Sequence, residues 1–387
     1  MQNRKPTIQR AIRISLVSLG AILILVTGIL LIRPASASPA QDGRTQESPQ
    51  NEACLSCHNK PDLSRPMPNG EKLTLSIDRT HFLDSVHGTI DCTECHIGIS
   101  SFPHPDLDAR SLRDVSMQFY TVCQTCHVEQ YDLTLDSVHQ KALAGGNTMA
   151  AICTDCHNPH TQTALQDSSG NLLPQARVQI PQKCSTCHGE IYEQYQQSVH
   201  GSALTSENNP DVPTCIDCHG VHNIGDPTTT SFRIDSPNLC ANCHTDPTIM
   251  DKYGIPTQVL STYVADFHGT SVSLFESQSP DQPTNKPVCY DCHGVHDIKR
   301  VDDPVYGLEM KQNLLGRCQA CHPGASENFP DAWMSHYIPS PEHYPIVYYV
   351  NLFYKFFIPG VLGPMTIFVV SDIVRRLIER AKGAKHS

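Results

Sequence analysis

The sequence predicts a mainly α-helical protein with extensive loops, short helices and an apolar segment at each end. Only 39% of its 387 residues are hydrophobic, and that share includes 18 cysteines and both terminal apolar runs, so the middle is poor in core-forming side chains. The 29 prolines, 22 glycines and one tryptophan are typical of loops. A stable interior therefore needs a component other than leucine and valine.

The cysteines identify that component. Every cysteine belongs to a C-x-x-C pair, and a histidine follows every pair directly. This pattern is the attachment signature of c-type haem, in which two thiols bond to the haem vinyl groups and the histidine places a nitrogen on the iron. We number the motifs 1 to 9 in chain order. Their cysteines are Cys54 and Cys57, Cys92 and Cys95, Cys123 and Cys126, Cys153 and Cys156, Cys184 and Cys187, Cys215 and Cys218, Cys240 and Cys243, Cys289 and Cys292, and Cys318 and Cys321. Their histidines are His58, His96, His127, His157, His188, His219, His244, His293 and His322.

Two other uses of cysteine fit the pattern poorly. A disulfide framework would not place a histidine after each pair, and zinc ribbons need pairs of pairs without a fixed histidine. We therefore expect nine covalently attached haem c groups, with the short helices wrapped around a chain of haems that serves as the core.

The net charge of −11 argues against nucleic acid as a partner, because a protein that follows a phosphate backbone needs a basic face. The haem propionates would add negative charge. Redox partner proteins with a basic surface are consistent with this charge.

The N-terminal segment predicts export. Arg4, Lys5, Arg10 and Arg13 precede an apolar run over 14–32, which approaches the length of a membrane span. The small residues at 35–37 resemble a cleavage site, so residues 1–37 are either a membrane anchor or a signal peptide. A linker over 38–50 follows.

A second apolar segment runs over 345–370 and contains Lys355, Pro359 and Pro364. The basic residues that follow it, from Arg375 to Lys385, mark the cytoplasmic side. A tilted or kinked span is the favoured interpretation, and an interfacial aromatic segment followed by a short span is the alternative. The expected domains are thus a haem domain over 51–343, on the periplasmic face of the cytoplasmic membrane, and a transmembrane segment with a basic tail over 344–387.

Twelve histidines lie outside the motifs, and nine of them recur at regular places. Five stand after an odd-numbered motif, mostly in a Ser-Val-His setting: His87, His139, His200, His268 and His336. Four stand shortly after an even-numbered motif: His104, His160, His222 and His296. The chain is therefore a repeat of two-motif units, with motifs 1 and 2 in the first unit and motif 9 as a final half unit. Residues 215–224 (CIDCHGVHNI) and 289–298 (CYDCHGVHDI) are its best-preserved copies.

The count gives one additional histidine for each haem, so these nine residues are predicted to be second axial ligands. A histidine three residues after a motif histidine cannot easily reach the opposite face of the same haem. We therefore expect His160, His222 and His296 to ligate haems of other motifs. His81, His343 and His386 do not fit the repeat and are expected at the surface.

On these motifs the chain resembles multihaem cytochromes of the cytochrome c3-like, doubled C-x-x-C-H type, over roughly residues 51–336. An anchor before a haem array is also similar to the membrane quinol dehydrogenases related to NapC and NirT, although the number of motifs and the C-terminal segment depart from them. The aromatic stretch over 342–356 looks like the linker by which such cytochromes join a membrane cytochrome b. The resemblance implies an electron-transfer role with such a quinol-oxidising subunit as partner.

Two functions follow from the number of iron ligands. If every iron has two histidines, no position is left for a substrate, and the protein carries electrons from the membrane partner to periplasmic or extracellular acceptors. If one haem lacks its second ligand, the protein is a reductase of a nitrogen or sulfur oxyanion. Because the number of additional histidines equals the number of motifs, the sequence favours the carrier.

Overall fold

The computed structural model describes residues 48–279, 282–333 and 336–383, and the side chains among these up to residue 380. The predicted anchor or signal peptide over 1–37, and all but the last three residues of the predicted linker, lie outside this part. The chain divides into two compact units, 1–48 and 49–387. All nine motifs belong to the second unit.

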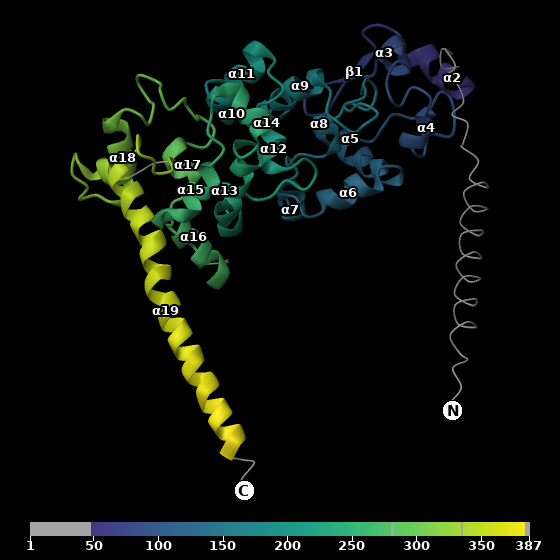
Figure 1. Ribbon diagram of the computed structural model, residues 1–387. Coiled ribbons are helices and arrows are strands. Elements are labelled where there is room, and N and C mark those ends of the chain that lie inside the picture. Colours follow the sequence, from purple (N-terminus) through teal and green to yellow (C-terminus); the bar gives the residue numbers. More distant parts are fainter. Residues whose placement is uncertain (1–47, 280–281, 334–335, 384–387) are drawn as a thin grey trace, which may run out of the picture. The chain divides into compact units, whose positions relative to one another are not determined.

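The prediction of a mainly helical chain is confirmed (Figure 1). The only sheet among the described residues is a hairpin of β1 (Ser64–Pro66) and β2 (Lys72–Thr74), antiparallel with Arg65 opposite Leu73. The helices fall into three groups. Nine carry the C-x-x-C-H motifs in order: α2 (Pro49–His58), α4 (Cys92–Cys95), η1 (Tyr120–Thr125), α8 (Cys153–Cys156), α9 (Pro174–Ser185), α12 (Cys215–His219), α13 (Thr230–His244), α17 (Cys289–His293) and α18 (Lys311–Cys321).

The second group begins within the Ser-Val-His segments or their equivalent. It consists of α7 (Val138–Ala144), α11 (Val199–Glu207) and α16 (Phe267–Gln278). The third group connects the others: α3 (Arg79–Leu83), α5 (Leu112–Phe119), α6 (Val128–Thr134), α10 (Gly189–Gln196), α14 (Pro247–Met250), η2 (Asp251–Tyr253), α15 (Val259–Ala265), η3 (Phe329–Ala332) and, at the end of the chain, α19 (Pro345–Gly383).

The helices of the second group begin at a hydrogen-bonded cap. The hydroxyl of Ser198 accepts from the backbone N–H of Gly201 at 3.0 Å, and that of Ser137 accepts from Gln140 at 3.1 Å. A serine at this position satisfies one of the N–H groups that a helix start leaves unpaired. The recurring serine therefore fixes the direction of the turn that carries the neighbouring histidine.

The chain buries few apolar side chains of its own. The described residues include only 14 buried hydrophobic side chains, and the largest cluster consists of Ile234, Val272 and Val288. Valines beside the repeated histidines are half exposed, including Val86 at 50% and Val295 at 55%. Apolar side chains thus lie next to the histidines in the sequence but are not buried against one another.

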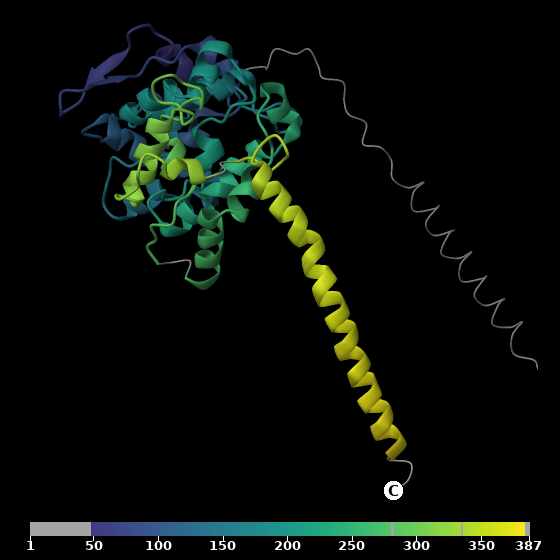
Figure 2. The ribbon, with the colours of Figure 1, turned by 60° about the vertical axis from the view of Figure 1, so that its left-hand side comes forward.

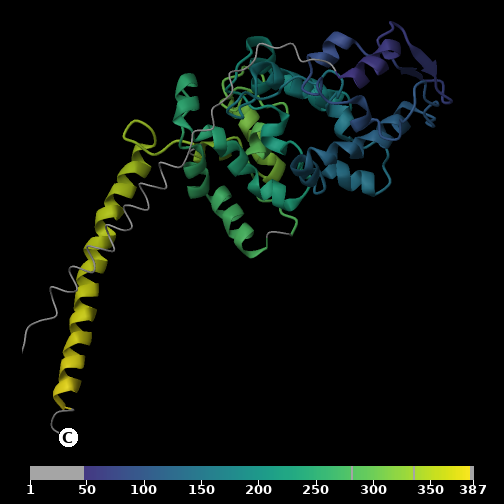
Figure 3. The same ribbon diagram turned by 90° about the vertical axis from the view of Figure 1, so that its right-hand side faces the viewer.

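Helix α19 has the length and composition of a membrane span (Figures 2 and 3). It runs through Pro359 and Pro364 as one helix of 39 residues, about 58 Å at 1.5 Å per residue, whereas the hydrocarbon core of a bilayer is about 30 Å thick. None of its most apolar stretch is buried within the described protein. The structure therefore has one continuous helix where the sequence left a kinked span or an interfacial segment open.

Candidate haem-binding site

The histidines outside the motifs lie opposite the motif histidines in pairs. Nine pairs of imidazole rings have centroids 5.9 to 6.5 Å apart. In the order of motifs 1 to 9, the pairs are His58 with His104, His96 with His160, His127 with His87, His157 with His222, His188 with His139, His219 with His296, His244 with His200, His293 with His336, and His322 with His268.

These separations fit an iron atom between the two rings. Two iron–nitrogen bonds of about 2.0 Å, each extended by about 1.1 Å from nitrogen to ring centre, require about 6.2 Å. The rings need not be parallel, since each turns about its own bond to the iron, and interplanar angles from 3° to 82° occur. Each pair lies beside two thiols of its motif, so the residues present fit a covalently attached haem.

Metal sites built from protein ligands alone fit less well. The described part of the chain contains no group of three or more histidine, cysteine or acidic side chains arranged to hold a metal ion. A pair of imidazoles suits a cofactor whose other four iron ligands belong to the porphyrin.

Several imidazoles are held in the form that binds iron. His58 Nδ1 donates to the carbonyl oxygen of Leu75 at 2.8 Å, and His87 Nδ1 donates to that of Pro159 at 3.0 Å, because a carbonyl can only accept. In the neutral tautomer that donates from Nδ1, the lone pair of Nε2 is available to bind iron. Burial lowers the pKa of His160, His200 and His293 to about 4, which keeps these rings neutral.

The pairing follows a reciprocal rule. From motif 3 onward, each odd-numbered motif receives a histidine from the preceding unit, as His127 does from His87. Motifs 2, 4 and 6 receive one from the following unit, as His219 does from His296. Neighbouring units therefore exchange histidines in both directions.

The two ends of the repeat differ from its interior in which histidine faces the motif. His336, which the sequence groups with the Ser-Val-His set, lies opposite His293 of an even-numbered motif. Motif 1 has no preceding unit, and His104 of its own unit lies opposite His58. The longer spacing between His104 and motif 2 is explained by this different partner.

A backbone hydrogen bond accompanies the exchange at three junctions. In each case the valine of a Ser-Val-His segment donates its N–H to a backbone carbonyl of the next unit. The acceptor stands two residues after the histidine that follows the even-numbered motif, and all three bonds are 2.8 Å long. The bonds are Val86 to Gln162, Val138 to Ile224, and Val199 to Ile298. At the last junction a side-chain bond takes their place, from Trp333 Nε1 to Asp266 at 2.6 Å.

The motifs also follow one another in space. The first cysteine of an odd-numbered motif lies near the first cysteine of the next even-numbered motif, as Cys54 does to Cys92 and Cys240 to Cys289. The second cysteine of an even-numbered motif lies near the next odd-numbered one, as Cys95 does with Cys123 and Cys292 with Cys318. In Figure 1 the motif helices accordingly run in colour order from α2 and α4 to α17 and α18.

Repeated arginines join the two motifs within a unit, and the motif pattern alone did not reveal them. Arg113, Arg177 and Arg233 precede an odd-numbered motif and pair with Asp155, Asp217 and Asp291 inside the next even-numbered one, at 2.8, 3.0 and 2.7 Å. The aspartate also accepts the N–H that begins its own short helix, as from Val288 at 2.7 Å. The sequence signal for these ion pairs was the aspartate that recurs as C-x-D-C in motifs 4, 6 and 8.

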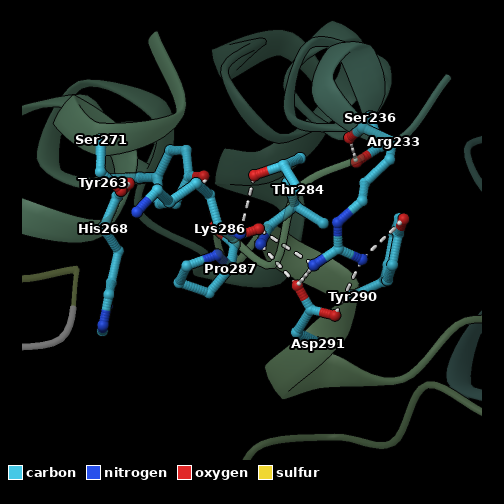
Figure 4. Close-up of polar contacts among 11 residues, drawn as sticks. Arg233, Ser236, Tyr263, His268, Ser271, Thr284, Lys286, Pro287, Tyr290 and Asp291 are labelled. Atoms are coloured by element: carbon cyan, nitrogen blue, oxygen red, sulfur yellow. Dashed lines mark hydrogen bonds and ion pairs between the residues drawn. The ribbon is translucent and has the colours of Figure 1, made fainter. Parts of the chain in front are cut away.

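Figure 4 shows the third of these contacts. Arg233 reaches both carboxylate oxygens of Asp291, the carbonyl oxygen of Lys286 and the hydroxyl of Tyr290. In the first unit Asn51, which is fully buried, has a similar role: its amide donates to Ile90 and accepts from the N–H of Cys92. Helices carrying neighbouring motifs are thus fixed side by side by polar bonds.

The histidines outside the repeat lie elsewhere. The His81 ring is 3.4 Å from a carboxylate oxygen of Asp78, and the His343 ring stacks on Tyr337 with centroids 5.5 Å apart. His386 lies outside the described residues.

One comparison with known proteins bears on this site. Residues 170–245 match the family model of cytochrome c3. The matched segment contains motifs 5, 6 and 7, so the match supports a multihaem c-type cytochrome with an electron-transfer role. No curated protein and no solved structure matches the chain.

Proposed function

We propose that the chain is a membrane-anchored cytochrome with nine haem c groups that transfers electrons from a quinol-oxidising, cytochrome b-like membrane subunit to periplasmic or extracellular acceptors. The observation that carries this proposal is the set of nine ring pairs, each with the separation that one iron requires. The match of residues 170–245 to cytochrome c3 supports the same class.

The ligand set favours a carrier over a reductase. When bound, each haem iron exchanges one electron between its ferrous and ferric states. The cysteines would attach the group, and the two paired histidines would both bind its iron, so a substrate would find no free position there. A nitrogen or sulfur oxyanion reductase would need a motif histidine without a second ring opposite it, and each of the nine motif histidines has one.

The arrangement of the motifs supports a single electron path. Consecutive motifs have cysteines near one another, and they are further linked by Arg–Asp pairs within three units and by exchanged histidines between units. Because these contacts link each motif to the next along the chain, we infer that the haems follow the order of motifs 1 to 9, with motifs 1 and 9 at the ends of the path.

Helix α19 supports the proposed location. Its apolar stretch is long enough to cross a bilayer, its first turns carry Tyr348, Tyr349 and Tyr354, and its last turns carry Arg375 and Arg376. Aromatic residues favour the membrane interface, and basic residues favour the cytoplasmic side. The haem domain would then face the periplasm, with motif 9 close in sequence to the membrane segment.

Two measurements on the purified full-length protein test the proposal. A chemical haem assay should give nine haems per chain, and electron paramagnetic resonance of the oxidised protein should show that all are low-spin. Fewer than nine haems would contradict the cofactor count, and a high-spin haem in the resting protein would favour the reductase. Purification from native membranes should also recover a b-type cytochrome, and the absence of any quinone-active subunit would contradict the proposed electron source.

A further inference from the structure

His104 differs from the other eight paired non-motif histidines in two respects. It pairs with a motif of its own unit, whereas the other eight pair with a motif of a neighbouring unit. It is also the only one of the nine that is exposed, and its neighbours over 101–106 are exposed as well. The motif 1 site is therefore the one whose second histidine lies nearest to solvent.

The segment around His104 has few bonds to the rest of the protein. Residues 104–109 form no helix or strand, and His104 Nδ1 donates only to the adjacent carbonyl of Pro105, at 2.8 Å. By contrast, His87 donates to Pro159 of the next unit, and His200 lies on α11 behind the buried cap Ser198, which is 2% exposed. Movement of His104 therefore breaks no bond between units.

Fixed points lie on both sides of this segment. Arg65 donates to the carbonyl of Leu107 at 2.6 Å, and Gln118 donates to that of Asp108 at 2.8 Å. On the other side, His96 belongs to motif 2 and pairs with His160. Residues 97–106 lie between these points and contain no helix or strand, and Asp106 at their end is held by its ion pair with Arg65.

We propose that His104 is an exchangeable ligand, so that the motif 1 site binds small neutral iron ligands, such as carbon monoxide or nitric oxide, when reduced. This inference rests on the proposed haem ligation. The exchange balances without a redox step: the His104 nitrogen leaves with its lone pair and the incoming ligand supplies its own. Asp106 stands two residues after the histidine and pairs with Arg65 at 3.7 Å, so among the described residues the site carries no unpaired cation that would attract an anionic ligand.

Carbon monoxide titration of the reduced holoprotein tests the proposal. The wild-type protein should bind about one molecule per chain, as measured by the change in the Soret absorption band. The variant His104→Ala should still bind one, because the same haem is affected, but should bind it faster, since no ligand has to leave. The control variant His200→Ala, which opens the motif 7 site, should bind two.

Two results would overturn the proposal: no binding by the wild-type protein, or a rise to two molecules in His104→Ala. Carbon monoxide binding by the wild-type protein tests the proposal even if a variant is poorly produced. A haem assay on the same samples separates this outcome from a failure of the proposed function, because nine haems without carbon monoxide binding would contradict only the exchangeable ligand.

Discussion

The ring of His296 lies 6.1 Å from the ring of His219, the histidine of an even-numbered motif one unit earlier. His296 follows motif 8 in the sequence but faces motif 6 in space. The second histidine at the motif 6 site therefore comes from a different unit, and a change at His296 should affect a motif that is distant in the sequence.

Replacement of His296 by alanine should convert one haem of nine to high spin, because only His219 remains to bind that iron. Electron paramagnetic resonance with counted spins measures this change. His81→Ala is the matched control and should leave every haem low-spin, since His81 contacts Asp78 and no motif histidine. An unchanged spectrum in His296→Ala would show that this histidine is not a ligand.

Replacement of Arg233 by alanine should lower the free energy of unfolding by about 1–3 kcal/mol, because it leaves the half-buried Asp291 without its cation. Denaturant titration measures the loss. Arg300→Ala, which removes the exposed pair with Asp302, is the control and should cost less than about 1 kcal/mol. Equal losses in the two variants would contradict a specific role for Arg233.

Replacement of Gly201 by alanine should disturb the start of α11 and weaken His200 as a ligand. A Cβ at this position would collide with the backbone carbonyl of Tyr195, which cannot move aside as a flexible side chain would. The expected result is one haem that becomes partly high-spin. Gly189→Ala adds a methyl group with no atom within 4 Å and should have no effect on the spectrum.

A chain produced without haem attachment should fail to fold cooperatively. Its own buried apolar side chains are few, and residues such as Val86, Val295 and Phe267 are left exposed beside the histidines. Circular dichroism during thermal unfolding, together with limited proteolysis, tests this prediction. A sharp melting transition in the haem-free chain would contradict it.

The sequence by itself determined the local chemistry. The motif spacing predicted the attachment cysteines and their histidines, the repeat singled out nine further histidines, and the composition predicted many loops. These predictions could be made without the tertiary structure because each depends on residues within one turn or on a regular spacing along the chain.

Only the tertiary structure decided which histidine faces which motif. The pairs His219–His296 and His58–His104 depend on how units pack, and spacing does not encode the direction in which a loop crosses to its neighbour. The pairing of Arg233 with Asp291 could not be predicted from the sequence for the same reason, because the two residues are 58 positions apart. The recurrence of such contacts was visible in the sequence, but their partners were set by the packing of one unit against the next.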